Sequence, residues 1–230
     1  MSVHLQRQID RLKRMLLGLG AQVEENLIRV MSAVEKHDPA LAAEVVAADR
    51  PIDDLEVSIE EECLHTLALH QPVAFDVRYV VAVLKIKTEL ERIGDLAANI
   101  AERAIERGRR ATPHEAATIS AIAERASLVV KLALDAIVDV DTATAREALV
   151  AQEDLASAAD SLRRNLHKAV LDSPERVGVY LPWLSTAHYF EQIGTHASEI
   201  ARHVIAMAEG HDAVPMPQPA PAAVPPSAIA

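Results

Sequence analysis

The decapeptide ERIGDLAANI (Glu91–Ile100) returns one hundred residues later, in altered form, as EQIGTHASEI (Glu191–Ile200). Both segments have apolar residues at helical spacing, and each carries a glycine at the same place, Gly94 or Gly194, in a chain with seven glycines. A glycine inside a helix costs about 1 kcal/mol relative to alanine. We therefore expect each glycine to mark the close approach of another helix or of a bound group.

The repeat extends over most of the chain. Three pairs of landmarks lie about one hundred residues apart: Asp38-Pro39 with Asp141-Thr142, Gln71-Pro72 with Ser173-Pro174, and Gly94 with Gly194. A fixed period of this kind indicates a duplicated unit. We predict an all-α protein made of two tandem three-helix bundles, one over residues 1–110 and one over residues 111–210.

The apolar periodicity predicts three helices in each half. Their ranges are 3–37, 39–70 and 73–107, followed by 115–140, 143–171 and 175–209. Pro51 should kink or split the second helix near Asp49-Arg50, and Gly210 should end the last one. Residues 211–230 hold six of the twelve prolines, interleaved with alanine and valine, so we predict a disordered tail there.

Composition narrows the possible functions. Apolar residues make up 50% of the chain and aromatic residues 3%, which favours helices over sheets. The net charge of −11 repels phosphate backbones, so we expect no nucleic-acid partner. A single cysteine, Cys63, excludes an internal disulfide and fits a reducing compartment. Every apolar run is too short to span a bilayer, so we expect no membrane insertion and a cytoplasmic location.

A row of polar side chains follows one face of the third predicted helix. Glu91, Asp95 and Asn99 stand four residues apart, so their side chains lie above one another. Two carboxylates at this spacing repel each other. A bound cation would make their proximity favourable, because carboxylates are ligands for hard metal ions. The alternative is a solvated acidic face.

A second carboxylate pair, Asp49 and Asp53, lies on the preceding helix. The two helices should run antiparallel about a turn near residue 71, which places this pair opposite Glu91 and Asp95. Four carboxylates on facing helices predict an oxygen-rich metal cage. Helix capping by Asp49, just ahead of the Pro51 break, is the competing explanation.

The same face of the second half has a different composition. His188, Glu191 and Glu199 are its candidate metal ligands, whereas Thr195 replaces the aspartate and Arg202 adds a positive charge nearby. We expect a second site that is weaker, selective for a different metal, or lost.

Taken together, these motifs resemble those of the PhoU family, and the duplicated plan resembles it over about residues 1–210. The segments that carry the resemblance are Asp49-x-x-Ile52-Asp53-x-Leu55-Glu56, Gln71-Pro72-Val73, Asp76-Val77-Arg78, and Leu90 to Asp95 with Asn99-Ile100.

The resemblance implies multinuclear iron or zinc clusters held by the acidic motifs. On this chain the implied ligands are Glu91 and Asp95 with Asp49 and Asp53, and in the second half Glu191 alone matches its motif position directly. Members of the family are accessory regulators that restrain the high-affinity phosphate transporter and damp the phosphate-starvation response. They are thought to contact the ATPase of the phosphate ABC transporter and the membrane sensor histidine kinase.

Three functions follow from these observations. The first is a non-enzymatic cytoplasmic regulator of phosphate uptake and phosphate-starvation signalling, in which a metal-binding helical adaptor meets its partners. The second is a metal-dependent phosphatase or oxidase that uses the same carboxylate cage. The third is a metal-free scaffold whose acidic stripe meets a basic partner. We also expect a homodimer, because a long acidic bundle with an alanine-rich surface offers a face to a second copy.

Overall fold

The computed structural model describes residues 3–73, 75–107 and 113–210. Its elements are α1 (Val3–Lys36), α2 (Pro39–Ala47), α3 (Asp49–His70), α4 (Phe75–Arg107), α5 (Pro113–Asp139), α6 (Thr142–Asp172), a 3-10 turn η1 (Pro174–Arg176) and α7 (Val177–Glu209). Within the described residues there is no strand. The predicted all-α class and the predicted helices are confirmed, whereas the tail over 211–230 lies outside the described residues.

The turns that end α1 and α5 show the duplication at atomic detail. His37 and Val140 take the left-handed conformation, with φ of 52° and 55°. The next residue in each case caps the following helix: the carboxylate of Asp38 accepts from Ala40 N at 2.9 Å, and that of Asp141 accepts from Ala143 N at 2.9 Å. Aspartate at this position satisfies backbone donors that the helix leaves unpaired. The same reversal is therefore built twice.

The predicted break in the second helix is also confirmed. α2 ends at Ala47 and α3 begins at Asp49, with Pro51 in the first turn of α3. Proline has no backbone N–H and its ring collides with the carbonyl four residues earlier, so a continuous helix across this point is excluded. The break places Asp49 in the first turn of α3.

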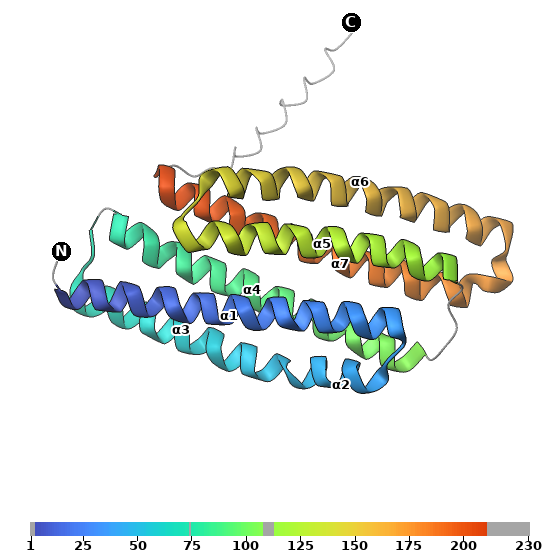
Figure 1. Cartoon of the computed structure of the whole chain (residues 1–230), viewed down its shortest axis with the longest axis horizontal. Helices are drawn as coiled ribbons and strands as arrows, with labels where there is room; N and C mark the ends of the chain where they lie inside the picture. Colours follow the sequence, from blue (N-terminus) through green and yellow to red (C-terminus); the bar gives the residue numbers. More distant parts are fainter. Residues whose placement is uncertain (1–2, 74, 108–112, 211–230) are drawn as a thin grey trace, which may run out of the picture.

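The two halves form two antiparallel bundles that pack along their length (Figure 1). α1, α2, α3 and α4 make the first bundle, and α5, α6 and α7 make the second. α4 and α7, the helices that carry the repeated decapeptide, pack against each other between the bundles. α1 also contacts α5, where a side chain at Gly20 would lie 2.7 Å from Leu134 Cδ2.

A continuous core runs through both bundles. The apolar residues Leu90, Ile93, Ala97 and Ile100 are fully buried in α4, and the matching positions of α7 are buried too. Cys63 lies in this core as a free thiol. No helix in the described part of the chain has the length and apolar content needed to cross a membrane.

Candidate metal centre

Three aspartates from two helices converge on one surface of the first bundle. Asp49 and Asp53 lie one turn apart on α3, and Asp95 lies on α4. One carboxylate oxygen from each falls within 4.8 Å of the other two. We call Asp49, Asp53 and Asp95 the carboxylate cluster. The predicted meeting of the two acidic helices therefore occurs in the fold.

Gly94 allows the two helices to approach at this point. A Cβ atom there would lie 3.2 Å from Cγ2 of Ile52 and 3.7 Å from Oδ1 of Asp49. Ile52 is fully buried, so it fills the space that a side chain at residue 94 would need. The glycine thus brings the α4 backbone close to α3, and the aspartates on either side of this contact come together.

Burial and mutual repulsion disfavour the ionised forms of these carboxyls. The pKa of Asp49 is raised to about 6, first by burial and then by the charges of Asp95, Asp53 and Glu102. Burial and the charge of Asp53 also raise the pKa of Asp95. Oδ1 of Asp49 is buried and has no hydrogen-bond partner among the described residues. A buried acceptor without a partner is costly, and a cation would satisfy it.

The donor set fits a hard metal ion. Oxygen ligands surround such ions at about 2.0–2.6 Å, so two ligands of one ion lie no more than about 5 Å apart. The oxygens of the carboxylate cluster meet this condition. All three donors are carboxylates, which suit Mg²⁺, Ca²⁺ and Mn²⁺ and which also bind iron in helical bundles and zinc.

Two other predicted ligands of the first half lie beside the cluster. Glu91 is outside the group whose oxygens approach within 4.8 Å, yet burial and the charges of Asp95 and Asp53 raise its pKa. The side-chain amide of Asn99 donates to the backbone oxygen of Asp95 at 2.8 Å. Glu91 is near enough to the cluster for the aspartate charges to act on it, whereas the amide nitrogen of Asn99 is engaged by its own helix.

The second bundle repeats the helix contact with different chemistry. A Cβ atom at Gly194 would lie 2.2 Å from Leu155 Cδ2 and 2.3 Å from Gln152 Oε1, so Gln152 takes the place of Asp49. Its Nε2 donates to Thr195 Oγ1 at 3.2 Å, and Thr195 takes the place of Asp95. A neutral hydrogen bond therefore stands where the first bundle has two carboxylates.

The predicted ligands of the second half are not gathered into a carboxylate cluster. Glu191 Oε2 lies 2.6 Å from Arg163 Nη2 and 3.8 Å from His188 Nδ1. Glu199 Oε1 lies 3.2 Å from Arg202 Nε. Each carboxylate therefore has an arginine partner, and the Arg163 guanidinium supplies the positive charge that an ion would otherwise bring.

Arg163 and Lys87 are the charged residues that sequence reasoning missed. Lys87 is almost fully buried on α4 and pairs with Glu56 and with Glu60, the latter at 2.6 Å. The repeat offset carries a usable signal, because Arg163 stands where the first half has Glu60. The charge pattern is therefore inverted: the cation lies on α4 in the first bundle and on α6 in the second.

Comparison with known proteins gives a consistent picture. A model of the PhoU domain matches residues 16–104 and again residues 119–204. Over 204 residues the chain is 30% identical to the phosphate-specific transport system accessory protein PhoU homolog of Aquifex aeolicus, covering 89% of this chain and 92% of that protein. The homolog of Caulobacter vibrioides is 33% identical over 201 residues, covering 86% and 84%.

Solved structures have the same architecture. The crystal structure of PhoU from Pseudomonas aeruginosa superposes with a TM-score of 0.86 at 28% identity and covers 90% of this chain and 99% of that one. The phosphate transport system regulatory protein PhoU from Streptococcus pneumoniae superposes with a TM-score of 0.83 at 20% identity, covering 90% and 98%. The second likeness concerns the fold alone.

Proposed function

Because this chain belongs to the PhoU family, whose members are accessory or regulatory proteins of phosphate transport, we propose that it is a cytoplasmic metal-binding adaptor that restrains phosphate uptake. The family is one of regulators rather than enzymes. The proposal adds a metal centre, partner proteins and a role in phosphate-starvation signalling to that general role.

The carboxylate cluster is the observation that carries the proposal. Asp49 and Asp53 on α3 and Asp95 on α4 would hold the metal, and Glu91, whose pKa is raised by burial and by the charges of Asp95 and Asp53, is the proposed fourth ligand. Iron or zinc would supply positive charge between the two helices and so offset the repulsion that raises these pKa values. The packing of Gly94 against Ile52 brings α3 and α4 together, and the aspartates beside this contact present one acidic surface.

The proposed partners are the ATPase of the phosphate ABC transporter and the sensor histidine kinase. A net charge of −11 speeds encounters with basic surfaces, and the long helices that lie side by side offer extended faces for docking (Figure 1). A homodimer is part of the proposal. Pull-down of the purified ATPase or of the purified kinase with this chain tests each interaction directly.

Metal content of the purified protein tests the centre. Protein dialysed against Fe(II) or Zn(II) should retain metal, and Asp95→Ala should lose most of it. Thr195→Ala changes the equivalent position of the second bundle and should retain as much metal as the unaltered protein. Equal losses in both variants would contradict the assignment.

Phosphate uptake by cells tests the regulatory role. Cells that lack this chain should take up phosphate without restraint in phosphate-rich medium, and the unaltered chain should restore control. Unchanged uptake in the deletion strain would refute the role. Hydrolysis of phosphate esters by metal-loaded protein, abolished by Asp95→Ala, would replace the adaptor with an enzyme.

A further inference from the structure

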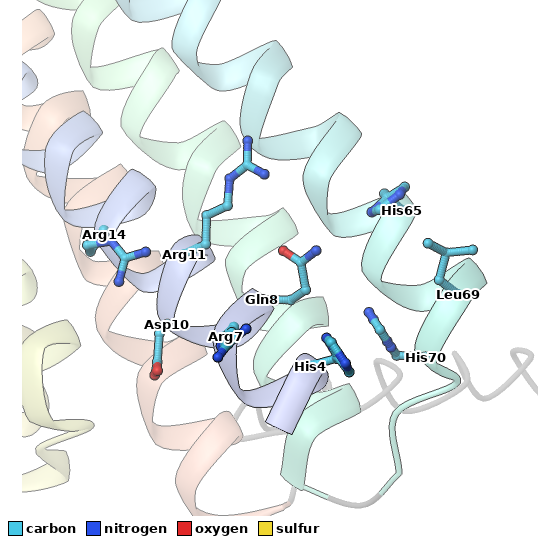
Figure 2. A pocket seen from close by; sticks show the side chains of 9 residues that line it. All are labelled: His4, Arg7, Gln8, Asp10, Arg11, Arg14, His65, Leu69 and His70. Carbon is cyan, nitrogen blue, oxygen red and sulfur yellow. The ribbon is translucent and has the colours of Figure 1, made fainter. Parts of the chain in front are cut away.

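A basic groove lies between the first turns of α1 and the last turns of α3, far from the carboxylate cluster (Figure 2). It encloses about 550 Å³, within the usual range for small-molecule sites. Its cationic or cation-forming side chains are His4, Arg7, Arg11, Arg14, His65 and His70. In a chain with a net charge of −11, such a local concentration of guanidinium and imidazole groups favours an anionic ligand.

Two of the three arginines of the groove, Arg7 and Arg14, are available to a ligand. Within the described part of the chain, no carboxylate lies within ion-pair distance of Arg7 or Arg14, and both side chains are exposed. Arg11 is fixed from one side, since its Nη1 lies 3.2 Å from Oε2 of the mostly buried Glu62. Figure 2 shows Arg11 and Gln8 extending from α1 toward α3.

Asp10 is the acidic residue among those that line the groove, and it does not cancel the positive charge there. Asp10 accepts a hydrogen bond from the side chain of Gln6 at 3.0 Å and points away from α3 (Figure 2). His4 and His70 face the same opening from the two helices. Their ring N–H groups can donate to an oxyanion.

The spacing of the charges defines the class of ligand. Arg7 and Arg11 are four residues apart, or about 6 Å along the helix axis. Arg7 and Arg14 are seven residues apart, or about 10 Å. A single phosphate is too small to reach all three, whereas a short chain of phosphoryl groups matches this length. Among the described lining residues Leu69 is the aliphatic one, and the aromatic rings are the imidazoles of His4, His65 and His70.

We propose that this groove binds a small anion that carries several phosphoryl groups in a chain. Guanidinium groups suit such a ligand because each makes two parallel hydrogen bonds to phosphoryl oxygens. The site is separate from the carboxylate cluster: Asp49 and His65 are 16 residues apart on α3, or about 24 Å at the helical rise. The proposal therefore does not depend on metal binding.

Calorimetric titration with tripolyphosphate tests the groove. Chelator-treated protein should bind one equivalent, and orthophosphate should bind about tenfold more weakly or worse. The double variant Arg7→Gln/Arg14→Gln should weaken tripolyphosphate binding by about tenfold or more, because each lost guanidinium removes charge-assisted hydrogen bonds. Its helix content and melting temperature should not change, since both side chains are exposed.

Matched variants separate the groove from general electrostatics and from metal chelation. Arg29→Gln/Lys36→Gln removes the same charge from the far end of α1 and should leave tripolyphosphate binding unchanged. Asp49→Asn/Asp95→Asn should also bind normally, even though it lacks the carboxylate cluster. Equal weakening by both charge-removing variants would overturn the proposal, as would the absence of saturable binding.

Two other anionic ligands are tested in the same way. Phosphatidylglycerol vesicles and a poly-glutamate peptide present anionic surfaces without a phosphate chain. Binding to either one that is lost in Arg7→Gln/Arg14→Gln, with no binding of tripolyphosphate, would overturn the proposal in favour of a membrane surface or an acidic partner.

Discussion

At the scale of single residues, Asp49 is the group whose environment is least favourable in the metal-free protein. Its carboxyl is half-buried, has one oxygen without a partner and faces two other aspartates. These causes raise its pKa from 3.8 to about 6. Ionised Asp49 therefore destabilises the folded protein, and a bound cation would offset this effect.

This pKa shift predicts a pH dependence of stability. Between about pH 4 and pH 6 the folded protein keeps a proton that the unfolded chain releases, so the free energy of unfolding of metal-free protein should fall as pH rises through this window. Asp49→Asn should remove this component and be more stable than the unaltered protein at pH 7. Urea denaturation in chelator at pH 4.5 and pH 7 measures both effects.

Metal provides the control for that experiment. Added Fe(II) or Zn(II) should raise the urea midpoint of the unaltered protein at pH 7 and leave Asp49→Asn nearly unchanged. If the variant were less stable than the unaltered protein in chelator, the proposed repulsion would be wrong.

Residue-scale features were partly predictable from the sequence. Spacing of four residues and an antiparallel turn were enough to place Asp49 and Asp53 opposite Asp95, because helix periodicity fixes which side chains share a face. The ion pair of Arg163 with Glu191 was not predicted, since it depends on which long side chains reach across α6 and α7. Likewise, spacing alone could not show that Glu91 lies just beyond the group of three.

At the scale of helices, the glycines report where two backbones come close and where they do not. Gly194 lies against Leu155 and Gln152 at distances that admit no Cβ atom without movement, whereas Gly18 has open space around it. The duplicated decapeptide thus marks a duplicated helix contact. In α1, Gly18 marks none, whereas Gly20 lies against Leu134 of α5.

Alanine at these two positions should have opposite effects. Gly18→Ala should stabilise the protein by about 0.5–1 kcal/mol, because it lowers the conformational freedom of the unfolded chain and favours helix. Gly194→Ala should destabilise it by about 1–2 kcal/mol, because overpacking outweighs the gain in helix propensity. Chemical denaturation of both variants measures the difference. A stabilising Gly194→Ala would show that α6 and α7 separate easily.

The helices themselves were predicted to within a few residues, because proline, aspartate caps and apolar spacing act locally. The 3-10 turn η1 before α7 was not predicted. It depends on how Pro174 leaves the end of α6, and a local pattern does not distinguish a 3-10 turn from the first turn of an α-helix.

At the scale of the whole molecule, α4 and α7 pack the two bundles against each other. His196 Nδ1 on α7 lies 2.7 Å from Glu89 Oε2 on α4, and Arg103 Nη2 donates to Tyr189 Oη at 2.8 Å. Buried side chains of both helices belong to one continuous core. This pairing was not predictable from the periodicity of either half, since it depends on how two similar surfaces match in three dimensions.

Cooperativity can be measured because the chain has a single tryptophan. Trp183 is buried in the second bundle, whereas Ile59 is fully buried on α3, which packs within the first. Ile59→Ala should destabilise the protein by about 2–5 kcal/mol. If the bundles unfold together, Trp183 fluorescence and far-ultraviolet circular dichroism should shift to lower urea in step. A fluorescence transition that stays in place would show that the halves unfold separately.

The pairing of Arg163 with Glu191 gives the molecule a built-in asymmetry. A guanidinium tethered to its own helix cannot be removed by a chelator, so the charge balance at this point of the second bundle does not depend on the supply of metal ions. With the proposed centre in the first bundle, only that half would tighten or loosen as ion supply varies. The two halves of the duplicated chain would therefore differ in one respect: the first would respond to metal ions, and the second would not.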